Sequence, residues 1–122
     1  MAITWTIDNE GRADLGQSGI LQAVVGTFGA SDYVVGGYPI YAKDVGMSSI
    51  RGIIPSGFSS FGAGNPGGYV WEAQSPSTPG PANTYPWYLR ALEQSAATGP
   101  LVEPSASTSF AGGTIRLLIN GY

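Results

Sequence analysis

Apolar residues recur at every second position along several short stretches of this chain. In residues 3–8, Ile3, Trp5 and Ile7 alternate with polar residues, which is the pattern of a strand with one buried face. Similar stretches, alternating or rich in β-branched and aromatic residues, are 20–28, 33–35, 38–42, 49–55, 68–74, 87–92 and 113–122. The pattern therefore predicts seven or eight short strands.

The three tryptophans fall on the apolar side of these stretches. Trp5, Trp71 and Trp87 each share their side of a strand with aliphatic or small residues, as Trp87 does with Leu89. Truncating a buried aromatic side chain costs about 3–5 kcal/mol of stability. We therefore expect all three tryptophans in the core.

Loops rich in glycine, serine and proline separate the predicted strands. The longest cover 55–68, 75–86 and 95–113, and short strands joined by such turns are typical of antiparallel sandwiches and barrels. Only 43–49 and 92–97 favour a helical turn, and both are too short for a packed helix. The sequence thus predicts an all-β fold, an antiparallel β-sandwich with long Pro/Gly-rich loops.

A pair of glycines, Gly36 and Gly37, lies between two stretches rich in Tyr, Val and Ile. Glycine contributes no side chain to a core and loses more conformational entropy on folding than other residues. Two-residue loops suit type I′ or II′ turns, so the pair predicts a tight hairpin turn between 33–35 and 38–42. A bulge is the other interpretation.

Composition narrows the class of protein. The 122 residues fit one domain, residues 1–122, without cysteine or histidine. Only 11% of residues are charged and the net charge is −3, against about 25% charged residues in an average domain. This excludes a basic nucleic-acid surface and favours a surface that packs against other proteins. We expect no signal peptide, and no apolar run reaches the length of a membrane span.

Candidate catalytic groups are few. Lys43 is the single lysine and lacks the spacing of a serine–lysine site. Folding could pair Asp8 with Glu10, or Asp32 with Asp44, but turn and cap roles explain these carboxylates better. We therefore expect no catalytic residue and no enzymatic activity.

Two further segments could be read as ligand loops. Residues 8–14 hold three oxygen ligands close together but lack EF-hand spacing, and Asn-Glu-Gly suits a hairpin turn. Residues 61–68 are glycine-rich, but no helix or Lys-Ser/Thr pair follows, as a phosphate cradle needs. We expect no metal and no cofactor. Loop tyrosines such as Tyr41 and Tyr85 leave a carbohydrate-binding module open as an alternative.

Several short elements occur in the order found in one group of viral proteins. They are Asp32-Tyr33 with Gly36-Gly37, Asp44 to Met47 with Ile50, Gly68 to Trp71, Leu89-Arg90, and Arg116 to Tyr122. In this order the chain resembles the small structural proteins of tailed-bacteriophage heads, the capsid decoration or cement proteins. The third element departs from their pattern, because it ends in Glu72-Ala73 where they have Asp.

The resemblance implies a jelly-roll-like sandwich on the outer surface of the virion capsid. Such a protein binds the lattice of the major capsid protein and stabilises the mature head without catalysis. It implies self-association, with a homotrimer expected and a dimer also compatible, and contact with neither nucleic acid nor membrane. A head-fibre or tail structural protein is the related alternative.

Candidate contact segments are those rich in Phe, Tyr and Pro but poor in charge. They are residues 1–7, 55–67 and 75–86. The residues expected to touch the capsid are Met1, Ala2, Ile3, Phe58, Phe61, Tyr85 and Trp87.

Overall fold

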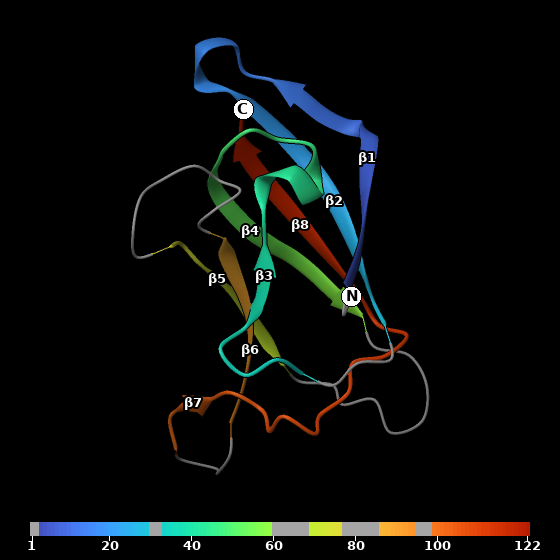
Figure 1. Ribbon diagram of the computed structural model, residues 1–122, viewed down its shortest axis with the longest axis vertical. Helices are drawn as coiled ribbons and strands as arrows, with labels where there is room; N and C mark the ends of the chain where they lie inside the picture. The colour runs from blue at the N-terminus through green and yellow to red at the C-terminus, as the bar shows by residue number, and fades with distance from the viewer. Residues whose placement is uncertain (1–2, 30–32, 60–68, 77–85, 95–98) are drawn as a thin grey trace.

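Two antiparallel sheets make up the protein (Figure 1). The computed structural model describes residues 3–29, 33–59, 69–76, 86–94 and 99–122. The first sheet has the order β1 (Ile3–Asp14), β2 (Ile20–Phe28), β8 (Thr114–Gly121) and β4 (Ile50–Ser59). The second has the order β3 (Tyr38–Ile40), β6 (Trp87–Gln94) and β5 (Val70–Gln74), and β7 (Leu101–Val102) pairs with the end of β6.

The buried face of each sheet follows the alternation in the sequence. Ile115, Leu117 and Ile119 of β8 are buried from the first sheet, and Leu89 and Ala91 of β6 from the second. These residues belong to one apolar cluster shared by both sheets. The predicted all-β sandwich is thereby confirmed. The jelly-roll arrangement is not confirmed, because the consecutive strands β1 and β2 pair within one sheet, as do β5 and β6.

The tryptophans occupy the interior as predicted. Trp71 is 9% exposed, and Trp5 and Trp87 are partly buried against the core. Trp71 is thus a core residue, and the other two pack at the edge of the core.

The double glycine forms a turn, but the predicted hairpin is wrong. Residues 33–35 are not a strand; the Gly37 N–H donates to the Val34 carbonyl at 2.9 Å and closes a turn before β3. Both glycines have positive φ, +95° at Gly36 and +106° at Gly37. A Cβ on Gly37 would lie 2.8 Å from Arg90 Cγ and 3.0 Å from the Leu89 carbonyl oxygen. The second glycine is therefore required by close packing on β6 as well as by its backbone conformation.

The predicted hairpin turn within 8–14 is also wrong. The strand β1 continues to Asp14, with a register irregularity between Asp8 and Arg12. The turn comes later, in the 3₁₀ segment η1 (Gly16–Ser18), where the Gly16 N–H donates to Asp14 Oδ1 at 2.8 Å. The residues that suggested a turn lie within this irregularity, where β1 has extra residues relative to β2.

Of the two predicted helical turns, the first is confirmed by the 3₁₀ segment η2 (Ala42–Val45). The second is wrong where it is described, because residues 92–94 are the end of β6. Its remaining residues lie outside the described part of the chain. The short strand β7 lies in what was predicted to be a loop.

Candidate interaction site

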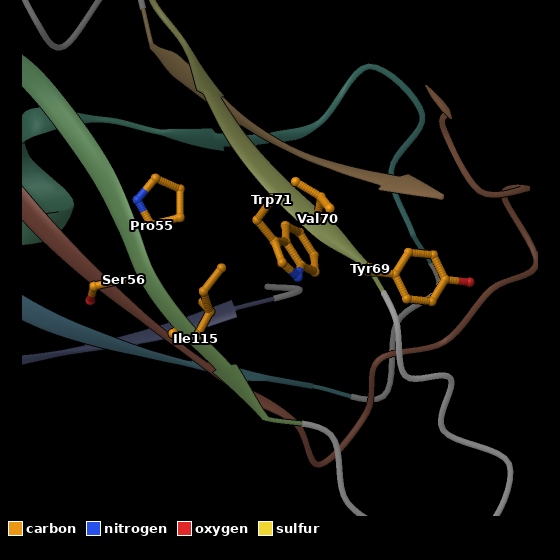
Figure 2. Close-up of a pocket in the computed structure, with 7 residues that line it drawn as sticks. Pro55, Ser56, Tyr69, Val70, Trp71 and Ile115 are labelled. Carbon is orange, nitrogen blue, oxygen red and sulfur yellow. The ribbon is translucent and has the colours of Figure 1, made fainter. Parts of the chain in front are cut away.

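A cleft of about 340 Å³ opens between the edge strands β4 and β5. Pro55, Ser56 and Gly57 of β4 and Ile115 of β8 line one side, and Tyr69, Val70 and Trp71 line the other (Figure 2). Its walls therefore belong to both sheets. A volume of this size lies at the lower end of the range of small-ligand pockets, about 300–1,000 Å³.

The β4 wall is shaped by an irregularity in the strand. The register with β8 shifts between Pro55 and Gly57, and the intervening Ser56 Oγ donates to the Arg116 carbonyl at 3.2 Å. That bond satisfies the serine hydroxyl within the protein itself. Gly57 pairs with the exposed Arg116, so a Cβ at this position would point to the outer face of the sheet, where it meets no described atom within 4 Å.

Aromatic rings pack behind the β5 wall. The Trp71 ring lies 5.1 Å from the Phe110 ring and 5.3 Å from the Phe28 ring, measured between centroids. Tyr69 meets Phe110 edge to face at 5.0 Å. Such contacts are the preferred geometries of aromatic pairs. The β5 wall is therefore held in place by the core.

The cleft carries no ionised side chain among the described residues that line it. Its single titratable group is Tyr69. Burial raises the pKa of Tyr69, and hydrogen bonding to Glu93 raises that pKa further. The phenol is thus neutral at physiological pH, and the site suits an uncharged group.

Large aliphatic side chains flank the cleft on the outer surface. Val70 is 54% exposed on β5, and Ile54, next to Pro55 on β4, is 62% exposed. Both follow from the alternation, because Trp71 and Ile53 take the inward positions. An uncharged cleft next to exposed aliphatic residues is typical of a protein-contact surface.

A second group of exposed aliphatic residues lies around β7. Its members are Val34, Val35, Leu101 and Val102. Glu103 connects their two segments, because its Oε1 accepts from Tyr33 Oη at 2.8 Å and from the Gly36 N–H at 3.0 Å.

Polar contacts hold this second region together. Tyr33 Oη accepts from the buried Ala91 N–H at 3.2 Å. Ala91 lies on β6 between the residues that pair with β3 and those that pair with β7. Arg90 Nε lies 3.0 Å from Glu72 Oε1 and 3.7 Å from Glu103 Oε1. Burial, followed by the hydrogen bond to Glu103, raises the pKa of Tyr33 far above its ordinary value. These contacts have a structural role.

The predicted contact residues do not assemble into the cleft where they are described. Ile3 is 4% exposed and packs in the core opposite Phe28, so its side chain offers no surface to a partner. Trp87 is partly buried on β6, opposite Ile40. The backbone of Phe58 pairs with Ile115 in β4, and its side chain is not described. Met1, Ala2, Phe61 and Tyr85 lie outside the described residues.

The predicted contact segment 55–67 includes the cleft residues Pro55 and Gly57, although neither was singled out as a contact residue, and Val70 was not predicted as part of a site. One signal for Val70 was present, because it is an apolar residue on the polar side of an alternating strand. Ile54 carries the same signal, since two adjacent isoleucines in a strand cannot both face inward.

Two other kinds of feature were sought in the described residues. No group of three or more acidic residues there could hold a metal ion. No helix in that part of the chain has the length and hydropathy needed to cross a membrane.

Comparison of the chain with protein-family models, with curated proteins and with solved structures gives no match in any of the three.

Proposed function

We propose that this chain is a non-enzymatic capsid decoration protein that binds the outer surface of a tailed-phage head and stabilises the mature lattice. The observation that carries the proposal is the uncharged cleft between β4 and β5, next to which Val70 on β5 and Ile54 on β4 are exposed. A β-sandwich with such a surface agrees with the resemblance in sequence. The chain acts by contact with the major capsid protein.

The stabilisation follows from linkage. A protein that binds the assembled lattice but not its separated subunits shifts the equilibrium toward the lattice. A subunit that touches two neighbouring capsid proteins adds its own contacts to those that must break when they separate. Several modest contacts on one clip act together through their effective concentration.

The site on the lattice sets the oligomeric state. A clip at a three-fold position is expected to be a homotrimer, and a clip at a two-fold position a dimer. We favour the trimer. Its subunits would each present the same cleft to the capsid surface.

The test is binding to expanded capsid shells of the same phage assembled without this chain. The purified protein is sedimented with the shells and the bound fraction is measured against added protein. We expect saturation at a fixed ratio to the major capsid protein, and cryo-electron microscopy should show density at one class of symmetry positions. Protein that stays in the supernatant at all concentrations would contradict the proposal. Retention on a polysaccharide matrix would then favour the carbohydrate-binding alternative.

A further inference from the structure

The outer edges of the two sheets differ in how they are protected. An exposed strand edge can pair with another chain, and proteins block such pairing with prolines, bulges, charges or very short strands. The edge strand β1 has an irregularity between Asp8 and Arg12, and β4 has two irregularities and Pro55. On the second sheet, β3 has three residues including Pro39, and β7 has two.

The strand β5 has no proline or bulge, and its one charged residue, Glu72, is paired with Arg90 of the neighbouring strand β6. Its five residues, VWEAQ, pair with β6 in unbroken register and contain neither proline nor lysine. No strand of the described residues pairs with its outer side. Among the described edge strands, β5 is therefore the one best suited to accept another strand.

The direction of the backbone groups can be worked out from Ala91. Its N–H donates to Tyr33, so it points away from β5. Successive residues of a strand direct their backbone groups to opposite sides, so Arg90 and Leu92 face β5. Arg90 and Leu92 pair with Glu72 and Val70, so the backbone groups of Glu72 and Val70 face β6. Ala73 follows Glu72, and its N–H and C=O therefore point to the opposite side, the outer edge of the sheet.

The cleft lies beside this same edge. A strand added along β5 would direct alternate side chains toward β4, where Pro55, Gly57 and Ile115 enclose the open volume. Recognition by strand addition has these two parts: backbone bonds supply affinity, and pockets for alternate side chains supply specificity.

The charges of the site define the occupant. None of the described residues lining the cleft is ionised, and the Glu72 carboxylate on β5 already pairs with Arg90 at 3.0 Å. A charged side chain entering the cleft would lose its water without gaining a partner. An uncharged, apolar side chain matches the site.

We infer that β5 is a docking edge, which binds an extended segment of the capsid subunit as an added strand and takes one apolar side chain of that segment into the cleft. The inference rests on the proposed function, because the capsid subunit is the partner.

Two substitutions test the two parts of this interaction. Ala73→Pro removes the outward N–H without removing a bond to β6, and Ala73→Ser is its control because it keeps the N–H. Pro55→Phe fills the cleft from β4, because Pro55 lines it and pairs with the buried Leu117, so its side chain is on the inner face of the sheet. Gly52→Phe is the matched control, since Gly52 is also on β4, has no described atom within 4 Å of its Cβ, lacks a positive φ and lies outside the cleft.

Binding of each variant to the expanded shells is measured by sedimentation, after thermal unfolding has shown which variants are folded. We expect Ala73→Pro and Pro55→Phe each to weaken binding at least about ten-fold, the loss of roughly one backbone hydrogen bond or one buried contact. Both controls should bind as the unchanged protein does. If Ala73→Pro does not fold, the comparison of Pro55→Phe with Gly52→Phe still decides the outcome.

Hydrogen exchange provides a separate readout. The Ala73 amide should exchange quickly in the free protein and become protected on the shells. Protection already present in the free protein would overturn the inference, because the edge would then be covered by the chain itself.

The remaining outcomes separate the two proposals. If the unchanged protein does not bind the shells, the proposed function fails and the docking edge falls with it. If it binds and both test variants bind equally well, the docking edge alone is wrong. If the variants dissociate an oligomer in ultracentrifugation but bind as before, the edge belongs to a second copy of the chain, which also refutes the inference.

Discussion

The Tyr33 hydroxyl joins three segments that are far apart in the sequence. It donates to Glu103, 70 residues later, and accepts from the Ala91 N–H, 58 residues later. The residue is 2% exposed, and its ring meets Tyr38 edge to face at 5.5 Å between centroids. The substitution Tyr33→Phe keeps the ring and removes only the two hydrogen bonds.

The expected loss of stability follows from what each partner can do afterwards. The Ala91 amide is buried, so it would be left without an acceptor, at a cost of about 1–3 kcal/mol. Glu103 keeps the Gly36 N–H and is only partly buried, so water can replace the lost donor at a cost of about 0.5–1.5 kcal/mol. We expect Tyr33→Phe to lower the free energy of unfolding by about 2–4 kcal/mol.

The measurement is urea unfolding followed by tryptophan fluorescence, with thermal unfolding alongside it. A loss of this size corresponds to a fall in Tm of roughly 8–16 °C for a domain of this length. Tyr88→Phe is the matched control, because Tyr88 is on the same strand as Ala91 but exposed. It should change stability by less than about 0.5 kcal/mol. Equal, small effects of the two substitutions would refute the role assigned to the Tyr33 hydroxyl.

Three further results are expected. Gly37→Ala should lower the free energy of unfolding by about 2 kcal/mol or more, and Gly36→Ala by about 1 kcal/mol. Both glycines have positive φ, but only a Cβ on Gly37 meets neighbouring atoms. Equal losses in urea unfolding would contradict the close packing of Gly37 on β6. Leu89→Ala should cost about 2–5 kcal/mol at its fully buried position, and a loss under about 1 kcal/mol would contradict that burial. The pKa values of Tyr33 and Tyr69 are both raised above 10.0, so the folded state holds protons that the unfolded state releases. Stability should therefore be complete below pH 10 and fall as the pH rises above it, and urea midpoints that stay constant from pH 8 to 11 would contradict this.

The strands were predictable where burial of one face determines the pattern. Residues 20–28 coincide with β2, and the inward positions Ile115, Leu117 and Ile119 follow from a two-residue period. A slip of one residue would expose every one of these side chains, so the register is strongly specified. Local sequence and tertiary structure agree in these stretches.

The failures occurred where distant contacts determine the local structure. Tyr33, Val34 and Val35 have high strand propensity, but Glu103 and Ala91 hold Tyr33 outside the ladder. No local pattern could indicate those bonds. The strand β7 forms for a similar reason, because its two residues pair with β6 and lack an alternation of their own.

The candidate site was predictable only in part. That Val70 and Ile54 face outward could be inferred from alternation, but the cleft depends on how β4 approaches β5 from another sheet. Its shape also depends on the irregularity after Pro55, which has no distinctive sequence signal. The approach of two sheet edges is a property of the assembled fold.

The two sides of the sandwich are closed differently, and the difference bears on function. Beside β1 the 3₁₀ segment η2 buries Ala42 and Val45, and a Cβ on Gly46 would lie 3.0 Å from Ile7 Cδ1. Beside β5 the cleft stays open and the strand edge has no protecting proline, bulge or lysine. An unprotected edge next to an apolar cleft promotes aggregation of the free protein. A chain that works while bound to a partner can retain such an edge, because the partner covers it, and the role proposed above on a capsid surface would meet this condition.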